Sequence, residues 1–416
     1  MKIVKGFLSL ALVVLTPASF AMAQNAPLTL KDCYRLALAR SESIGIQKEL
    51  IKETEGLMLQ SLSTALPKVA FAYTQTWQDL KPNNTFGGYQ PGARFTFSQP
   101  LFTGFKEFAA IRASKHLGKQ RDAELKRAEQ LLFTDVSDSF YLYLSYQEDL
   151  KVQEDIQKIL IDRVTELKKR EVLGKSRTSE VASAQAKLLV TEAGIEASRG
   201  QKDVAGQLLD FIIGQPVGEL AVETLPDGTQ DLQVLEQKVD ERLDVVAARE
   251  SLGAFKENIV AARSLFFPSV LLTGDSYTKR TDANEGNNWD VMLSVNVPIF
   301  NGLNDVGQVR QARAQANEAD LKLSLARRNA VLEIRNAFTK LEAARRNAVA
   351  LSKAVLASDK NYHLQVDDFQ KNLVNNLDVL QALEDLQSVR RSEVAADTDV
   401  NRAFWDLKVA TGEELK

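Results

Sequence analysis

Apolar residues in the second half of the chain recur at intervals of three and four positions. The region from Gln308 to Thr411 contains neither glycine nor proline, so it lacks the residues that most disfavour a helix. Alternating steps of three and four are the heptad pattern of helices that pack side by side, and a four-four step at Ala330 is a stutter that relaxes the supercoil. The pattern predicts a long helix with apolar or small residues along its packing seam, at positions 309, 312, 316, 319, 323, 326, 330, 334, 337, 341, 344, 348, 351 and 355.

An equivalent stretch occurs in the first half, from Glu107 to Leu173, where Gly118 is the only glycine or proline. At about 1.5 Å per residue, a helix of this length would reach roughly 100 Å. A compact domain of this size does not have that diameter. We expect the charged residues between the seam positions to face solvent.

Two pairs of segments alternate like strands, and each pair precedes one of the long helices. Phe71 and Tyr73 alternate with small or polar residues in the first pair, as Val291 and Leu293 do in the second. The exceptions are Gln75 on the apolar face and Met292 on the polar face. About ten residues of such alternation is the length that a tilted strand needs to cross a bilayer. The predicted strands are residues 68–78, 93–102, 269–278 and 289–300.

These strands allow two interpretations. In a soluble protein they would form a small sheet whose apolar face is covered by helix. In a membrane, four strands are too few to close a barrel, and an open sheet edge cannot lie in lipid. Several chains would then have to contribute strands to one barrel, and the polar face of each strand would line the lumen.

The two halves of the chain are related by a constant offset. Pro100-Leu-Phe-Thr-Gly104 corresponds to Pro298-Ile-Phe-Asn-Gly302, an offset of 198 that still relates Gly214 to Gly412. An offset without net insertion indicates that the spacing is under physical constraint, as in helices that must keep a packing face. We therefore divide the chain into a first repeat at 24–214, an inter-repeat linker at 215–240 and a second repeat at 241–412. Each repeat comprises a helix, two strands and a long helix pair.

The N-terminus has the features of a secretory signal. A basic start precedes an apolar stretch from Phe7 to Leu15 and the small-residue site Ala21-Met22-Ala23, so we expect residues 1–23 to be removed. The apolar stretch is short for a retained membrane anchor. Cys33, the only cysteine, lies outside the region of lipoprotein processing and cannot form an intramolecular disulfide.

Charge and motifs argue against several classes of function. The net charge is −3, with 55 acidic and 52 basic residues interspersed, which is unlike a nucleic-acid-binding protein. His116 and His363 lie on expected helices without a metal-like cluster, and motifs for hydrolysis or phosphate binding are absent. We therefore expect no enzyme activity, no cofactor and no metal site.

The order of the predicted elements resembles the TolC family of outer-membrane efflux proteins. The resemblance rests on the signal, the two copies of helix, strands and helix pair, and the P-x-F-x-G turn after each second strand, and it extends from Leu28 to Gly412. It implies an α+β membrane protein that assembles as a homotrimer. Each chain would supply four strands to a transmembrane β-barrel shared between subunits, and a long α-helical coiled-coil barrel would continue it into the periplasm. The junction between the two barrels would be marked by Pro100, Gly104, Pro298 and Gly302.

The resemblance also implies that both helix pairs turn at the closed periplasmic end of the tunnel. The turns are expected at 174–180 and 372–378, where the offset aligns Gly174 with Asn372 and Thr178 with Asn376. We interpret these four residues as candidate docking tips for a periplasmic adaptor. Thr178 and Asn376 are good N-cap residues for the helix that follows each turn.

Glu180 and Asp378 are the candidate gate residues, because they match the first-turn acids that constrict the tunnel in the family. The alternative is that both acids only complement the helix dipole. Phe369 falls where an aromatic hydroxyl partner is often found in the family, and Gln381 where some members carry a second acid. Basic candidates to pair with the acids are Lys175 and Arg177.

The function that the resemblance implies is a passive exit duct in the cell outer membrane, in contact with its lipid. Such a duct would dock to a periplasmic adaptor and an inner-membrane pump or ABC transporter, which would supply the energy. The alternatives are a type I protein secretion channel and a soluble periplasmic coiled-coil scaffold. No partner among nucleic acids is expected.

Overall fold

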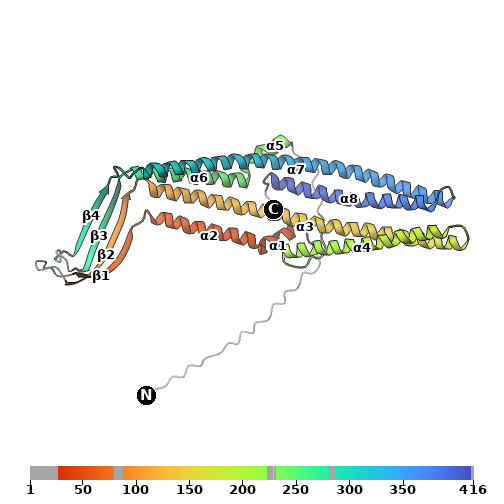
Figure 1. Ribbon diagram of the computed structural model, residues 1–416, viewed down its shortest axis with the longest axis horizontal. Helices are drawn as coiled ribbons and strands as arrows, with labels where there is room; N and C mark the ends of the chain where they lie inside the picture. The colour runs from red at the N-terminus through yellow and green to blue at the C-terminus, as the bar shows by residue number, and fades with distance from the viewer. Residues whose placement is uncertain (1–26, 79–87, 223–227, 229–230, 281–285, 414–416) are drawn as a thin grey trace, which may run out of the picture.

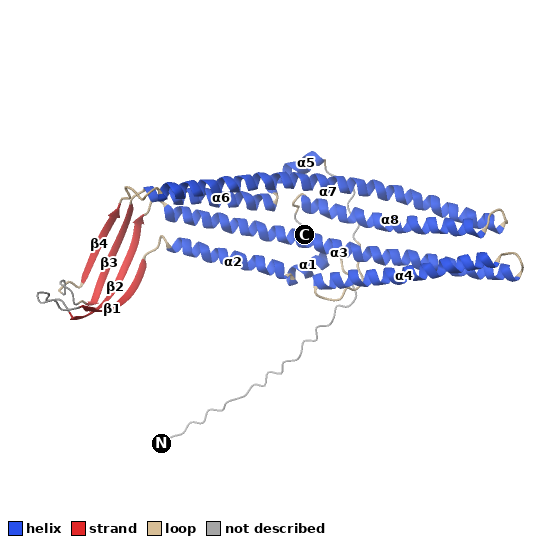
Figure 2. Ribbon diagram, viewed as in Figure 1, coloured by secondary structure: helices blue, strands red, loops and turns tan. Residues whose placement is uncertain are grey.

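The computed structural model describes residues 27–78, 88–222, 228, 231–280 and 286–413. Within them, a layer of long helices extends from a four-stranded sheet at one end (Figures 1 and 2). The first repeat contributes α1 (Leu30–Arg40), α2 (Glu42–Ser63), β1 (Lys68–Gln78), β2 (Gly88–Phe102), α3 (Lys106–Val172) and α4 (Thr178–Ile213). The linker contains α5 (Leu232–Gln237) and most of η1 (Lys238–Glu241), and the second repeat contributes α6 (Leu243–Arg263), η2 (Ser264–Phe266), β3 (Ser269–Lys279), β4 (Trp289–Asn296), α7 (Asn304–Gln370) and α8 (Asn376–Ala410). The signal peptide predicted at 1–23 lies outside the described residues.

The long helices predicted from the seam pattern are α3 and α7. Each contains 67 residues, which corresponds to about 100 Å. Because the two lengths are equal, the turns that follow α3 and α7 lie together at the end of the molecule opposite the sheet (Figure 1).

The seam predicted on α7 is buried in the half of the helix nearer the sheet. The buried residues are Val309, Ala312, Ala316, Ala319, Leu323, Ala330, Ile334, Ala337 and Leu341. Seam positions 344, 348, 351 and 355 are only partly buried. In the half of the molecule away from the sheet, α8 packs along one side of α7, and the other side of α7 forms an edge of the layer (Figure 1).

The helices form one layer instead of a bundle around a central core. Nearer the sheet the order across the layer is α2, α3, α6, α7, and in the far half it is α4, α3, α8, α7 (Figure 1). The outermost helices expose large apolar side chains, which include Val190, Val204 and Phe211 on α4 and Leu321, Leu332 and Leu356 on α7. Within the described ranges, no helix is both long and apolar enough to cross a membrane.

The sheet is antiparallel in the order β1-β2-β3-β4. Two predicted boundaries need correction. β2 begins at Gly88 instead of 93, because residues 88–92 pair with 74–78 of β1. β4 ends at Asn296 instead of 300, because Asn296 is opposite Ser269, where β3 begins, so the following residues have no partner strand.

The register of the sheet separates an apolar face from a polar face. Val69 lies opposite Phe97 and Phe71 opposite Phe95, so these side chains share a face, and all four are exposed. On the same face, the exposed residues of β4 are Trp289, Val291, Leu293 and Val295. Gln75, the predicted exception, donates a hydrogen bond to the Tyr73 hydroxyl (2.9 Å), which reduces the cost of a polar group there.

The inter-repeat linker predicted at 215–240 is not irregular throughout. Its last part forms α5 and most of η1, which pack on α7 through buried Leu235 and Val239. Glu236 accepts a hydrogen bond from Arg335 of α7 (2.6 Å). A helix of six residues has too few positions to show a heptad pattern and is marginal on its own, so its packing on α7 and the cap by the Asp231 side chain both stabilise it.

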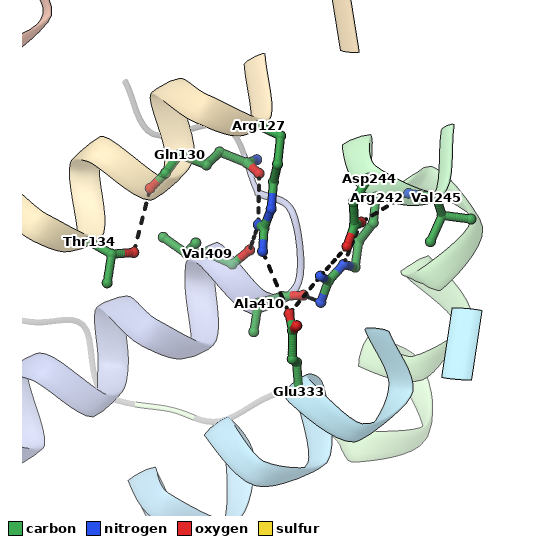
Figure 3. Close-up of polar contacts among 9 residues, drawn as sticks. All are labelled: Arg127, Gln130, Thr134, Arg242, Asp244, Val245, Glu333, Val409 and Ala410. Atoms are coloured by element: carbon green, nitrogen blue, oxygen red, sulfur yellow. Dashed lines mark hydrogen bonds and ion pairs between the residues drawn. The ribbon is translucent and has the colours of Figure 1, made fainter. Parts of the chain in front are cut away.

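Arg242 lies where α6 begins and α8 ends, and its side chain is fully buried (0% exposed). It donates two hydrogen bonds to Asp244 (3.1 and 2.7 Å), one to Glu333 of α7 (2.7 Å) and one to the Ala410 carbonyl at the end of α8 (2.9 Å) (Figure 3). Burial alone would lower the pKa of Arg242, but its hydrogen bonds with the two carboxylates raise it above its ordinary value.

Arg127 of α3 completes this group. Its guanidinium lies 3.5 Å from the Glu333 carboxylate and donates to the Val409 carbonyl (3.3 Å) (Figure 3). We call Arg127, Arg242, Asp244 and Glu333 the mid-layer cluster. It balances two cations with two anions, satisfies carbonyls at the end of α8, and ties α3, α6, α7 and α8 together.

Replacing Arg242 by alanine should destabilise the protein strongly. Asp244 and Glu333 would lose their main partner. Because both carboxylates are partly exposed and Arg127 remains beside Glu333, the cost should be about 2–3 kcal/mol, below that of breaking a fully buried ion pair. Thermal unfolding followed by circular dichroism in detergent measures the effect. Arg335→Ala is the matched control, because it removes an exposed ion pair from α7, the helix that carries Glu333, and should change the midpoint little. Equal midpoints for the two variants would contradict the role given to the cluster.

Candidate functional site at the helix-turn tips

The turns after α3 and α7 have the same backbone geometry, although their sequences differ. Gly174 (φ 69°) and Asn372 (φ 59°) both adopt the left-handed conformation. In each turn the next residue donates its N–H to a carbonyl five residues earlier, Lys175 to Arg170 (2.8 Å) and Leu373 to Asp368 (2.9 Å). This is the Schellman arrangement that ends many helices. Asparagine can occupy this position at residue 372 in place of glycine, because it enters the left-handed region more readily than most residues.

The predicted N-caps need correction, because the capping residues lie one position earlier. They are Arg177 for α4 and Asn375 for α8, both with extended backbone. The side chain of Asn375 accepts hydrogen bonds from the N–H groups of Leu377 (2.7 Å) and Asp378 (3.2 Å). Thr178 and Asn376 are therefore the first residues of their helices, where a side chain no longer points back at the free N–H groups.

Glu180 and Asp378 occupy equivalent positions at the third residue of their helices. Glu180 accepts hydrogen bonds from the Ser176 hydroxyl (2.5 Å) and the Arg177 N–H (3.0 Å), and Asp378 accepts one from the Asn375 N–H (3.0 Å). Both acids therefore return a hydrogen bond to the start of the helix, as in a capping box. The bond from Ser176, together with that from the Arg177 backbone, holds the pKa of Glu180 below its usual range.

Asn376, which does not cap its helix, connects the two repeats instead. Its side chain is buried. The amide oxygen accepts a hydrogen bond from Arg163 of α3 (2.9 Å), and the amide nitrogen donates to the Glu180 carbonyl of α4 (3.3 Å). The Asn376 side chain thus holds the start of α8 in the second repeat against α3 and α4 of the first repeat, at the backbone of the candidate gate acid Glu180.

Phe369 is buried beneath two arginines of the first repeat. The guanidinium carbons of Arg163 and Arg170 lie 3.9 and 4.4 Å from its ring centre, which is cation–π distance. Glu166 lies 2.9 Å from Arg163 and 3.7 Å from Arg170. Phenylalanine has no hydroxyl group, so the contact at this position is made by the face of the ring.

Arg170 also donates a hydrogen bond to the Asn372 side chain (2.9 Å). We call the six residues Arg163, Glu166, Arg170, Phe369, Asn372 and Asn376 the inter-repeat clasp. Sequence reasoning placed Phe369, Asn372 and Asn376 at the tip but missed the two arginines. Their spacing of seven residues is a signal that was available, since it places both on one face of α3.

Glu180 and Asp378 border one open cleft of about 580 Å³ between the tips, together with the basic candidates Lys175 and Arg177. The tips of the two repeats thus bring both candidate gate acids to a common surface. Gln381 lies one turn beyond Asp378 and donates a hydrogen bond to Asp385 (3.1 Å). In the described part of the chain, no group of three or more His, Cys, Asp or Glu side chains is placed to hold a metal ion.

At the opposite end of the long helices, the candidate junction also repeats. Gly104 (φ 66°) and Gly302 (φ 61°) are left-handed, and so is the residue after each. A Cβ atom at Gly104 would lie 2.7 Å from the Ser264 carbonyl, so the chain must pass close to η2 there. Pro100 extends β2 beyond its pairing with β1, whereas Pro298 follows the end of β4.

Comparisons with known proteins agree with this architecture. The sequence model of the family described as "Outer membrane efflux protein" matches residues 34–215 and 234–413, one match for each repeat. The cation efflux system protein CusC of Escherichia coli is 23% identical over 417 residues, which cover 90% of this chain and 88% of CusC. The proteases secretion protein PrtF of Dickeya chrysanthemi is 23% identical over 419 residues, which cover 92% of this chain and 88% of PrtF.

Among solved structures, the outer membrane protein VceC of Vibrio cholerae superposes with a TM-score of 0.83 at 20% sequence identity. The alignment covers 93% of this chain and 97% of VceC. At this identity the similarity establishes the fold. It extends over both the sheet and the helical layer.

Acid should loosen the tip of the first repeat through Glu180. Because its pKa is lower in the folded protein, its stabilising contribution is present above the usual glutamate pKa and is lost as the pH falls through the folded value. The protection of the amides of residues 176–181 against hydrogen exchange, corrected for the intrinsic pH dependence of the exchange rate, should therefore fall as the pH drops below the usual glutamate pKa. Glu180→Gln should show lower protection than the wild type at neutral pH and little further loss of protection in acid. Identical pH profiles in the two proteins would contradict this assignment.

Proposed function

This chain belongs to the outer membrane efflux protein family, and from that premise we propose that it is the outer-membrane channel subunit of a tripartite efflux system. It acts as a passive exit duct and not as an enzyme. The observation that carries the proposal is the sheet, whose apolar face is exposed and whose two edge strands lie at the end of a helical layer about 100 Å long.

The exposed face of the sheet has the chemistry of a lipid-facing surface. Trp77, Tyr89 and Trp289 are exposed at the end away from the helices, and Phe105 and Phe266 at the end near them. Aromatic residues at both limits of an apolar band are typical of membrane β-proteins. From residue 69 to 77, a strand extends about 26 Å at about 3.3 Å per residue, close to the height of such a band.

The two outer strands support assembly with further copies of the chain. In one chain β1 and β4 each pair on one side only, and an unpaired strand edge cannot remain in lipid. We propose that β4 of one subunit pairs with β1 of the next, and that the exposed apolar edges of α4 and α7 meet in the same way. The resemblance to TolC channels supports three subunits, which would form a closed barrel continued by a helical tunnel in the periplasm.

The helix-turn tips are proposed to form the periplasmic gate and the docking surface. Glu180 and Asp378 would line the aperture, and Gly174, Thr178, Asn372 and Asn376 would contact a periplasmic adaptor. The inter-repeat clasp supports this proposal, because it holds the two tips of a subunit through contacts weaker than buried ion pairs. Substrate and energy would come from an inner-membrane pump or ABC transporter.

Type I protein secretion is a second candidate within the same class of channel. It is favoured by the similarity to PrtF, which is described as a proteases secretion protein, whereas the similarity to CusC, a cation efflux system protein, favours efflux of small solutes. A soluble periplasmic scaffold fits less well, because the apolar face of the sheet is not covered by helix in the described residues.

Membrane fractionation tests the proposal. The mature protein should remain with the outer membrane after salt washing, and detergent should extract it as a particle of three subunits with mixed strand and helix signal in circular dichroism. Analytical ultracentrifugation in detergent measures the mass. Recovery of a soluble monomer from the periplasm would refute the channel.

Neutralising Asp378 should increase the leak through the isolated channel. Asp378→Asn removes the negative charge that the N-terminus of α8 favours and weakens the hydrogen bond accepted from the Asn375 N–H, a loss of about 1 kcal/mol at most. That energy corresponds to about fivefold more of the open tip, which single-channel recording in a planar bilayer detects. Gln381→Ala, one turn further along the same helix, is the control and should leave the conductance unchanged. If Asp378→Asn also conducts like the wild type, the gate assignment fails, but the channel assignment stands.

A further inference from the structure

The polar face of the sheet contains a hollow of about 180 Å³ in the half away from the helices. The hydroxyl-bearing residues Thr74 and Thr76 of β1 line one side, and Gly92 of β2 lies opposite Thr74. A Cβ atom at Gly92 would lie 3.0 Å from the Thr74 hydroxyl oxygen. The glycine therefore keeps the hollow open.

Three cationic side chains line this hollow: Arg94 of β2, Lys279 at the end of β3, and Arg280. Arg94 lies opposite Ala72 on one side and Tyr277 on the other. The guanidinium of Arg280 stacks on the Tyr277 ring at 4.1 Å. Residues from both repeats thus build one basic surface.

Two acids among the described residues lie near these cations. Asp290 lies 3.2 Å from Arg280. Asp275 lies 3.6 Å from Arg94, beyond hydrogen-bond distance, and accepts a hydrogen bond from the Thr96 hydroxyl instead. The Arg94 side chain is about half exposed (47%). Among the described residues that line or contact this hollow, the cations are therefore three and the acids two, although the whole chain has a net charge of −3.

We propose that Arg94 and Lys279, beside the Arg280–Asp290 pair, form a basic band on the lumen wall that favours the passage of small anionic solutes, those with carboxylate, phosphate or sulfate groups. This inference rests on the proposed channel, in which the polar face of the sheet lines the lumen. Three subunits would repeat the band around one pore. Rings of arginine and lysine are the usual means by which a pore selects anions.

The position of the band gives it a role distinct from that of the tips. Glu180 and Asp378 present negative charge at one end of the molecule, whereas the basic band lies in the sheet at the other end (Figure 1). A solute that has passed the acidic aperture would meet a positive surface before it leaves. At about 0.1 M salt the Debye length is about 10 Å, so the band acts on solutes near the wall.

Reversal potentials of the reconstituted full-length channel under a KCl gradient test the inference. Arg94→Glu should lower the chloride-to-potassium permeability ratio by about twofold or more, because it inverts one charge in each subunit. Arg94→Lys is the matched control, since it retains the charge, and should keep the wild-type ratio. The difference between the two variants should shrink in 1 M KCl, where the Debye length is about 3 Å.

The outcomes separate this inference from the proposed function. Wild-type protein that forms no conductance would overturn the channel and the basic band together. Channels of normal conductance in which Arg94→Glu and Lys279→Glu both keep the wild-type permeability ratio would overturn the basic band alone. A change in the ratio that persists unchanged in 1 M KCl would also overturn it, because an electrostatic effect must be screened.

Discussion

The structure depends on two helices of equal length that lie in a layer only one helix thick. Such a layer has no central core, so each turn of α3 and α7 is fixed mainly by its neighbours in the layer and by the connections at its two ends. Both helices have 67 residues, begin after a pair of left-handed residues and end in the same hydrogen-bonded turn. An insertion in one repeat alone would displace its tip and separate Arg163 from Asn376. The constant offset between the repeats follows from this constraint.

Two polar clusters connect the repeats, and they differ in strength. The mid-layer cluster buries Arg242 against Asp244 and Glu333, and breaking such a group from one side costs several kcal/mol. The inter-repeat clasp joins the tips through the ring of Phe369 and side-chain amides, contacts of about 1–2 kcal/mol each. The middle of the layer is therefore held more firmly than its end, which agrees with the proposal that the tip opens while the wall is kept.

The period of two along the strands gives the sheet both of its functional surfaces. One face collects Phe71, Phe95 and Leu293, and the other collects threonines and the basic residues around Arg94. Neither face is covered by helix in the described residues, and both outer strands pair on one side only. The single chain is therefore incomplete as a membrane structure, and assembly into a closed ring would satisfy the edges, the apolar face and the polar lumen together.

The sequence by itself determined the features that depend on near neighbours: the buried seam from Val309 to Leu341, the strand alternation, and the left-handed turns at Gly174 and Asn372. Periodicity and turn chemistry act over a few residues, so they can be read along the chain. Only the tertiary structure decided that Asn375 caps α8 while Asn376 binds Arg163, and that Arg242 meets the Ala410 carbonyl. Each of these contacts depends on a partner distant in sequence or on a backbone angle at a helix start. Because this chain carries a charge every few residues, no local pattern identifies which cation meets which acceptor.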